Sequence, residues 1–433
     1  MAKKTEKKRR AVIVGGVRTP FVRAFAEFIK MDAIDLGVAA VQGLLEQTQI
    51  PWNEVEGLYW GTVILPSGAP NVGREIALDI GLPPTTESMT VTRACASGLQ
   101  AITSAVETIE RGYADVMIAG GSDSTSNAEL KLPQSLVHKA APVAMSSKSG
   151  PMDYLKMLKS LSIKNDMLPR KPEIAERSTG QVMGEAAEEM AQRHSISREA
   201  QDEYAVTSHH RAAEAIASGR FKSEVLTVKT PSGKKVYADT IVRGDTSVKK
   251  MAKIRPAFAR KGTVTAGNAS TLTDGASAVL LMTEEKAKEL GFKPLAAFKS
   301  WAYVGVDPAD QLLLGPAIAM PKALDRAGLT LDDMDFVDIH EAFAAQVLAV
   351  VKMVESDAFA QERLGRTKAV GKIDRDKLNV HGGSVPLGHP FGATGARMVT
   401  TMANELAFSG KKHALLGICA AGGLAAGAVL EAV

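Results

Sequence analysis

Hydrophobic and polar positions along this chain follow two different periods. Short apolar runs are typical of buried strands, whereas apolar residues three and four positions apart are typical of helices. In the first 127 residues these patterns predict strands at 11–17, 55–64, 88–92 and 114–122, and helices at 33–49, 71–82 and 95–112. Asp35 is the expected cap of the first helix. Alternating strands and helices predict an α/β fold with helices on the faces of a sheet.

The pattern changes in residues 128–271, which are rich in Lys, Ser, Pro and Met. Helical spacing there is clearest in 184–220, and α/β alternation returns in a second block from about Pro294 to Val433. That block ends with a helical pattern followed by a strand, in the same order as 95–122, and Gly410 aligns with Gly112 after a shift of 298 residues. The order indicates a duplicated fold. Two equivalent strand–helix junctions would then meet at a shared site.

Composition excludes several classes of protein. Apolar residues make up 45% of the 433 positions, and the formal net charge is only +4, without a basic tract interleaved with aromatics, so a nucleic-acid partner is not expected. No apolar run reaches the roughly 18–20 residues of a membrane span, and the basic N-terminus leads directly into a strand pattern, so no export signal is expected. Two cysteines indicate a reducing compartment, which is the cytoplasm or, in a eukaryote, the mitochondrion.

The first junction carries Cys95, between a β-branched run and a helical pattern. Unpaired N–H groups and the helix dipole at a helix N-terminus favour a negative charge, so a low thiol pKa and a nucleophilic thiolate are expected there. Small neighbours, from Ala94 to Gly98, leave room for a substrate. A buried structural cysteine explains this segment equally well.

Three later segments carry further chemistry. His381 and His389 lie in a glycine-rich stretch before the second junction helix, Cys419 lies where a strand ends in small residues, and His340 begins "HEAFA". The zinc-protease pattern HExxH fails because position 344 is Ala, and no dinucleotide or P-loop glycine motif is present. Each segment alone is also compatible with a structural role.

Together these segments resemble the thiolase family over nearly the whole chain. The matching pieces include "RACASGLQAI" (93–102), "GTVTAGNAS" (262–270), "HEAFAAQ" (340–346), "GGSVPLGHPFGATGARM" (382–398) and "CAAGGLAAGAVLE" (419–431). "HEAFA" and "GHPFGATGARM" most resemble the degradative 3-ketoacyl-CoA branch, in which the thiolase is the β-subunit of a fatty-acid oxidation complex.

The resemblance implies a duplicated α/β/α/β/α layered fold with a mostly helical loop domain. The expected parts are an N-terminal half at 1–127 completed by 272–294, a loop domain at 128–271 covering the active site, and a C-terminal half at 295–433. The implied activity is CoA-dependent cleavage of a 3-ketoacyl-CoA to acetyl-CoA and a shortened acyl-CoA. It needs neither metal nor redox cofactor, and coenzyme A is a substrate.

Residue roles also follow from the resemblance. Cys95 becomes acylated, His389 takes its proton and then faces the thioester oxygen, and Cys419 exchanges a proton with the acetyl-CoA enolate. A water held by His340, where many relatives have Asn, completes one oxyanion hole. The N–H groups of Cys95 and Ala421 form the other. Ser270, Phe343 and Gly423 are expected to contact substrate, and no role is implied for His381.

Other activities stay open. An acetyl-CoA acetyltransferase would run the reaction as a Claisen condensation, a ketoacyl synthase shares the duplicated fold but lacks the second cysteine, and a thiolase-like scaffold would only hold partners.

Assembly is the remaining question. A homodimer or homotetramer is implied, together with a hydratase/3-hydroxyacyl-CoA dehydrogenase α-subunit. The basic amphipathic piece at 150–165 predicts either packing on the chain's own core or docking on a partner or an anionic membrane surface. Met152, Leu155, Leu158 and Leu161 share its helical spacing.

Overall fold

The computed structural model describes residues 9–169 and 175–433, which form two compact units. Unit 1 consists of Met1–Asn127 and Glu176–Val433, and unit 2 of Ala128–Ala175. Throughout the described ranges, no helix combines the length and the apolarity needed to cross a membrane.

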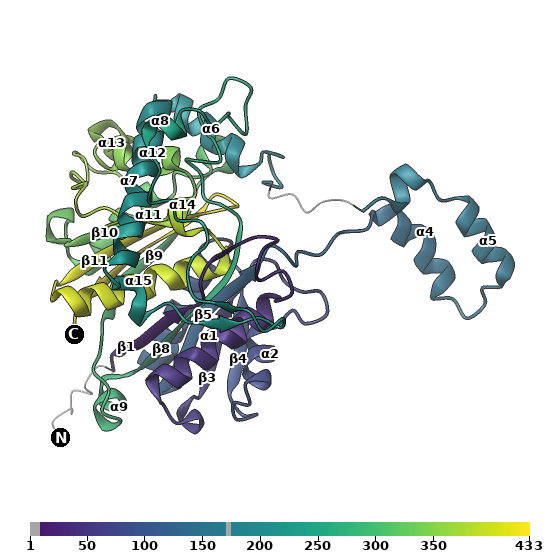
Figure 1. The fold of residues 1–433 in the computed structure, drawn as a ribbon, viewed down its shortest axis with the longest axis horizontal. Helices are drawn as coiled ribbons and strands as arrows, with labels where there is room; N and C mark the ends of the chain where they lie inside the picture. Colours follow the sequence, from purple (N-terminus) through teal and green to yellow (C-terminus); the bar gives the residue numbers. More distant parts are fainter. Residues whose placement is uncertain (1–8, 170–174) are drawn as a thin grey trace. The chain divides into compact units, whose positions relative to one another are not determined.

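Unit 1 contains two mixed sheets that repeat one pattern of strands (Figure 1). The strands of the first sheet, in spatial order, are β1 (Ala11–Arg18), β8 (Thr273–Thr283), β5 (Val116–Ser124), β3 (Gly57–Gly61) and β4 (Glu87–Val91), with β2 (Val22–Arg23) also paired to β8. Those of the second sheet are β10 (Phe336–Ile339), β11 (His413–Ala420), β12 (Leu424–Glu431) and β9 (Ala297–Gly305).

The pairing directions match strand by strand. In the first sheet β3–β5 is parallel, whereas β5–β8 and β8–β1 are antiparallel. In the second, β10–β11 is parallel, whereas β11–β12 and β12–β9 are antiparallel. The duplication inferred from the sequence is therefore visible in the sheets. Residues 125–272 connect β5 to β8, where the second half has only the turn 421–423 between β11 and β12.

Helices form three layers around the sheets. The central layer is α3 (Ser97–Glu110) and α15 (Gly392–Ser409), which pack on each other and share a core with strands of both sheets. One outer layer is α1 (Ala33–Thr48) with α2 (Val72–Asp79), and the other is α11 (Pro316–Ala327) with α12 (Ala344–Val354). The N-cap of α1 is Asp32 and not Asp35. Asp35 is the third residue of the helix, and its carboxylate accepts the backbone N–H of Asp32.

The connection between β5 and β8 supplies most other helices. The helical pattern at 184–220 folds as α6 (Met183–Arg193) and α7 (Arg198–Ala217), separated where Ser197 caps α7. The remaining elements of unit 1 are α8 (Val248–Met251), α9 (Glu284–Glu289), α10 (Pro308–Gln311), α13 (Asp357–Arg363), α14 (Ser384–Leu387), the pair β6 (Val228–Lys229) and β7 (Lys235–Val236), and short turns at Trp52–Glu54, Arg220–Ser223 and Leu331–Asp333.

Unit 2 contains a pair of helices, α4 (Gln134–Ala144) and α5 (Pro151–Lys159), followed by a π-helical turn at Ile163–Met167. Asp166 holds this turn to α4, because its carboxylate lies 2.8 Å from Lys139 Nζ. The amphipathic piece at 150–165 contains a helix, α5, but this helix ends before Leu161. No residue of α5 is buried. Unit 2 by itself therefore leaves the apolar face of α5 uncovered.

Candidate active site

The N-termini of the two central helices bring Cys95 and His389 together. Backbones approach closely here: a Cβ on Gly98 would lie 2.4 Å from the carbonyl oxygen of Gly392. Glycine at these positions therefore permits the contact between α3 and α15. As a result, His389 Nε2 lies 3.1 Å from Cys95 Sγ, across 294 residues of sequence.

The thiol of Cys95 is neutral in this setting. Helix α3 begins at Ser97, two residues after the cysteine, and Ala94 takes a left-handed φ of 46° to make the turn. Burial raises the pKa of Cys95 to about 12, although the N–H groups of Ala421 and of Cys95 itself favour the thiolate. The expectation of a low thiol pKa is therefore wrong, because desolvation outweighs the local donors.

His389 is a neutral base beside that thiol. Burial, followed by the charge of Arg397, lowers the pKa of His389 to about 3. Its Nδ1 lies 2.6 Å from Thr394 Oγ1, in the first turn of α15. If Nδ1–H donates to this hydroxyl, Nε2 presents a lone pair to Cys95 Sγ. The geometry thus pairs a proton donor with an unprotonated acceptor.

Cys419 is the second thiol of this region. It lies at the end of β11, is buried, and is a free cysteine like Cys95. Burial, followed by the charge of Cys95, raises the pKa of Cys419 well above its usual value. A neutral buried thiol can give up a proton only to a strong base such as an enolate.

His340 lies beside His389, with ring centroids 4.2 Å apart and ring planes tilted by 46°. Its backbone N–H donates to Gly417 on β11, and its Nδ1 lies 2.9 Å from Ser384 Oγ, which also accepts from Arg397 at 3.3 Å. His340 Nε2 is buried and has no hydrogen-bond partner among the described residues. Burial, followed by the charges of His389 and Arg397, lowers the pKa of His340 well below its usual value.

The neighbouring Glu341 anchors this loop. Its buried carboxylate accepts hydrogen bonds from four donors on α7, on α14 and on the loop before α14. These are Tyr204 Oη, Ser208 Oγ, Asn379 Nδ2 and Val385 N. Distances of 2.8–3.0 Å and burial of the group make this an ordered support for His340.

The other expected substrate residues lie on the segment that follows His340, on the strand-like segment beside it, and in the turn after Cys419. Ser270 donates its N–H to Ala342, and the adjacent Ala269 bridges to Phe343, which makes an edge contact with Phe258. The turn between β11 and β12 continues from Ala421 into Gly422 and Gly423, which have left-handed φ values of 82° and 64°. Glu176 Oε2 accepts the N–H of Gly422 at 2.8 Å.

Asp123, Thr394, Ser384, Arg397 and Glu341 were not selected from the sequence. Asp123, at the end of β5, accepts N–H groups from Val63, Ile64 and Gly392 and so holds α15 to the first sheet. Burial raises the pKa of Asp123 to about 7. Thr394, Ser384, Arg397 and Glu341 lie inside the quoted thiolase-like motifs, which was their only signal in the sequence, and Asp123 lies outside those motifs.

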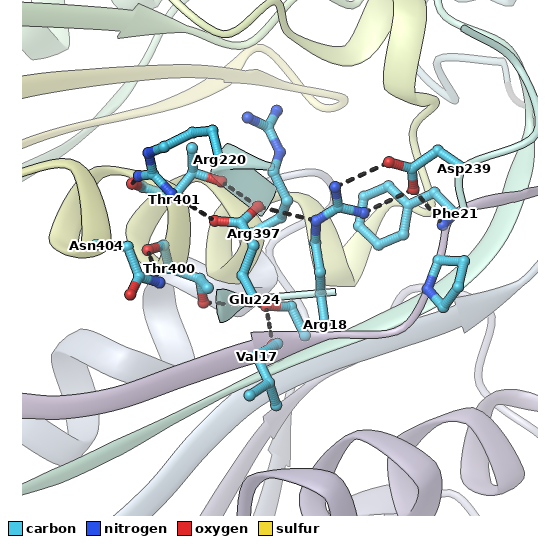
Figure 2. Close-up of polar contacts among 12 residues, drawn as sticks. Val17, Arg18, Phe21, Arg220, Glu224, Asp239, Arg397, Thr400, Thr401 and Asn404 are labelled. Atoms are coloured by element: carbon cyan, nitrogen blue, oxygen red, sulfur yellow. Dashed lines mark hydrogen bonds and ion pairs between the residues drawn. The ribbon is translucent and has the colours of Figure 1, made fainter. Parts of the chain in front are cut away.

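His381 lies outside the thiol cluster. Its Nε2 is 2.6 Å from Glu405 Oε2, which Arg220 also contacts at 2.6 Å. Although burial alone would raise the pKa of Glu405, these two partners lower it. Figure 2 shows the adjoining buried network, in which Arg18 lies between Glu224 and Asp239.

Comparisons with known proteins agree with this architecture. The family model described as thiolase, N-terminal domain, matches residues 11–285, and the model described as thiolase, C-terminal domain, matches 292–432. The chain belongs to the thiolase family. The resemblance inferred from its motifs and the layered α/β fold are both confirmed.

Relatives of this thiolase cover its whole length. A 3-ketoacyl-CoA thiolase of Photobacterium profundum is 45% identical over 430 residues, which are 99% of this chain and 98% of the relative. A 3-ketoacyl-CoA thiolase of Escherichia coli O157:H7 is 46% identical over 427 residues, 98% of this chain and 97% of the relative.

Solved structures also match this thiolase. The Bacillus anthracis acetyl-CoA acetyltransferase has a TM-score of 0.83 at 32% identity, covering 99% of this chain and 100% of that one. The human mitochondrial 3-ketoacyl-CoA thiolase in complex with CoA has a TM-score of 0.83 at 29% identity, covering 98% of each chain.

Proposed function

We propose that this thiolase is an acyltransferase of the 3-ketoacyl-CoA type, which cleaves a 3-ketoacyl-CoA with free CoA in fatty-acid β-oxidation. The observation that carries the proposal is the neutral Cys95–His389 pair, 3.1 Å apart at the meeting of the two halves. Relatives named 3-ketoacyl-CoA thiolase at 45–46% identity support this substrate class.

The first half-reaction makes an acyl-enzyme. Cys95 Sγ attacks the 3-keto carbonyl while its proton passes to His389 Nε2, which is unprotonated because burial lowers the pKa of the ring. Cleavage of the bond between C2 and C3 leaves the shortened acyl group on Cys95. The departing acetyl-CoA enolate takes the proton of the Cys419 thiol.

The second half-reaction transfers the acyl group to CoA. The Cys419 thiolate accepts the proton of the incoming CoA thiol, and CoA sulfur attacks the thioester. Cys95 leaves as a thiolate and recovers its proton from His389. Splitting the transfer into two steps gives ping-pong kinetics.

Two groups of donors stabilise the negative oxygens of these steps. The N–H groups of Cys95 and Ala421 point to the sulfur of Cys95 and would serve the oxygen that develops beside it. His340 would serve the other, together with His389. Because Arg397 can only donate to Ser384, that hydroxyl can donate to His340 Nδ1, which leaves Nε2–H facing the cluster, directly or through a water.

Free CoA is a proposed substrate, and it leaves as part of the shortened acyl-CoA product. The proposed reaction uses no cofactor. Ser270, Phe343 and Gly423 are proposed to line its path. A human mitochondrial 3-ketoacyl-CoA thiolase of the same fold was solved in complex with CoA, which supports this assignment.

The domain division and the assembly are also proposals. The matching strand patterns support an N-terminal half at 1–127 with 272–294, a C-terminal half at 295–433 and a loop domain at 128–271. We propose that the protein forms a homodimer or homotetramer. Residues 150–165 would dock on an α-subunit or on an anionic membrane surface. The proposed location is the cytoplasm or the mitochondrion. The uncovered face of α5 supports the docking role.

A substrate panel tests the activity. We expect CoA-dependent cleavage of 3-ketoacyl-CoA substrates from short to long chain, with an acyl mass on the Cys95 peptide. Cys95→Ala should abolish both signals. Acetoacetyl-CoA formation from acetyl-CoA as the sole efficient reaction would favour the acetyltransferase alternative, which the Bacillus anthracis structure represents. An inert wild-type protein would favour the scaffold alternative.

A further inference from the structure

Three potential metal ligands meet at the candidate active site. One ligand atom each from Cys95, His340 and His389 lies within 4.8 Å of the other two. We propose that these three side chains form a binding site for a thiophilic divalent metal ion, with Zn²⁺ as the favoured ion. Cys sulfur and His nitrogen are the ligands that Zn²⁺ selects in proteins.

The separations are close to what zinc requires. With Zn–S near 2.3 Å and Zn–N near 2.0–2.1 Å, neighbouring ligand atoms of a tetrahedral site stand about 3.3–3.6 Å apart. His389 Nε2 and Cys95 Sγ are already 3.1 Å apart, and no pair exceeds 4.8 Å. Small side-chain rotations therefore suffice.

The orphaned nitrogen of His340 is an independent sign of a ligand site. His340 is fully buried, and its Nε2 has no partner among the described residues. A buried polar atom without a partner costs roughly 1–3 kcal/mol. The ring is held from its other side, because Nδ1 lies 2.9 Å from Ser384 Oγ. A metal ion would satisfy Nε2.

Both imidazoles have the outer support found around metal ligands. The Nδ1 atoms of His340 and His389 lie beside the hydroxyls of Ser384 and Thr394. A ligating histidine usually donates its second ring N–H to such a partner. His389 already has its Nδ1 beside the Thr394 hydroxyl. At His340 the ion would displace the proton from Nε2 to Nδ1, where the Ser384 hydroxyl can accept it, because hydroxyls both donate and accept.

The charges of the region allow a cation. Binding of Zn²⁺ displaces the Cys95 thiol proton to solvent, and the thiolate neutralises one positive charge. Asp123 is a buried carboxyl whose charge acts on Cys95, so it offsets part of the remainder. The nearby Arg397 is paired with Asp338 at 3.4 Å. Cys95 is half-buried, and a water would complete the tetrahedral set of ligands.

A metal ion bound at this site would block the proposed thiolysis. Only this inhibition rests on the proposed function; metal binding itself does not. The metal would hold the sulfur lone pair of the nucleophile and the nitrogen lone pair of its base at the same time. A thiolase with Asn at position 340 would keep only two of the three ligands. His340 would therefore make this chain sensitive to zinc.

Metal binding can be measured without turnover. Unloaded protein, freed of metal with a chelator and dialysed against Co²⁺ or Zn²⁺, should take up one ion per chain at this site. The Co²⁺ form should show a sulfur-to-cobalt charge-transfer band and intense tetrahedral d–d bands. Cys95→Ser should lose the charge-transfer band. His340→Asn should raise the Zn²⁺ dissociation constant by more than about 100-fold. Loss of a residue that only supports a ligand already lowers metal affinity by up to about that factor.

Two control variants test whether another histidine or the second cysteine binds the metal. His413→Asn, at the opposite end of β11 from Cys419, should bind Co²⁺ like wild type. Cys419→Ala should also keep the charge-transfer band. A band that follows Cys419, or Zn²⁺ affinity unchanged in His340→Asn, would overturn the proposal. If wild-type protein binds metal but cleaves no ketoacyl-CoA with the metal removed, the proposed function fails while the metal site stands.

Discussion

The protonation of Cys95 is decided by two opposing effects on its thiol, burial and hydrogen bonding. Two N–H groups favour its thiolate, yet burial raises the pKa to about 12, while His389 stays neutral because burial lowers its pKa to about 3. The pair therefore rests as thiol and imidazole. The proton moves only when the sulfur attacks, so the thiol avoids alkylation by chance electrophiles.

Alkylation tests this resting state. In Cys419→Ala, with a chelator present, the rate of reaction of Cys95 with iodoacetamide should climb continuously with pH through the neutral and alkaline range, because the thiolate fraction follows a pKa of about 12. A plateau set by a pKa below about 7.5, as in an ion-paired thiolate, would contradict this expectation. Mass spectrometry of the Cys95 peptide measures the rate.

Cys419 has a separate role that a second variant isolates. Cys419→Ala should still take an acetyl group from acetyl-CoA onto Cys95, because His389 accepts the Cys95 proton and CoA can leave as a thiolate. It should lose exchange of the acetyl-CoA methyl protons with solvent deuterium by about 10²-fold or more, the usual contribution of a general acid–base group. NMR of acetyl-CoA follows the exchange. Exchange at the wild-type rate would exclude the role.

At the scale of elements, the contact between α3 and α15 sets the distance between nucleophile and base. Gly98→Ala would place a Cβ 2.4 Å from the carbonyl oxygen of Gly392 and force the helices apart. We expect a loss of about 1–3 kcal/mol of unfolding free energy from overpacking. Thiolysis should fall by at least about tenfold, since small displacements of reacting groups are costly.

Gly305→Ala is the matched control for that change. Gly305 ends β9, and a Cβ there would meet no atom within 4 Å. Denaturant titration and thiolysis assays should show little change in this variant. If Gly98→Ala behaves like Gly305→Ala in both assays, close helix contact does not set the geometry of the pair.

Helix α5 contacts α4 within unit 2 but has no buried residue. Leu155 and Leu158 are 46% and 59% exposed. The triple change Leu155→Gln, Leu158→Gln and Leu161→Gln should leave thiolysis of a short-chain substrate nearly unchanged. It should weaken sedimentation with anionic vesicles or capture of a hydratase/dehydrogenase subunit, because apolar area drives both contacts.

A surface control belongs with this experiment. Phe408→Gln removes a side chain that is 82% exposed at the end of α15, and it should leave both binding assays unchanged. Unfolding of the triple variant, seen by circular dichroism, would show that the leucines pack on the chain's own core. Retained binding would contradict the docking role.

At the scale of the whole molecule, Asp123 makes stability depend on pH. Burial raises its folded-state pKa from 3.8 to about 7, so the folded protein binds the proton more tightly than the unfolded chain. Its contribution to stability is therefore complete below pH 3.8 and is lost as pH rises to about 7. The rise of the Asp123 pKa from 3.8 to about 7 corresponds to about 4 kcal/mol of unfolding free energy.

Asp123→Asn should remove this slope. The variant should be less stable at low pH, since an amide cannot accept all the N–H groups that Asp123 accepts. Its stability relative to wild type should then rise between about pH 4 and 7. Denaturant titrations across this range measure the difference. A constant difference would show that Asp123 has an ordinary pKa in the folded protein.

Local patterns in the sequence predicted much of this protein. Periodicity located the strands and helices of both halves, because burial on one face imposes it within each element. Glycine-rich junctions and short motifs selected Cys95, His389 and Cys419, and the structure brings Cys95 within hydrogen-bonding distance of His389. The repeated order of elements predicted the duplicated sheets before any pairing was known.

Only the tertiary structure decided the protonation states and the supporting contacts. The pKa of Cys95 depends on the summed burial by segments hundreds of residues apart, which no local pattern records. The partner of His381 is Glu405, and the support of His340 comes from Ser384 and Glu341, because helices distant in sequence cross there. Local periodicity determined the elements, and the long-range packing of those elements determined the electrostatics of the site.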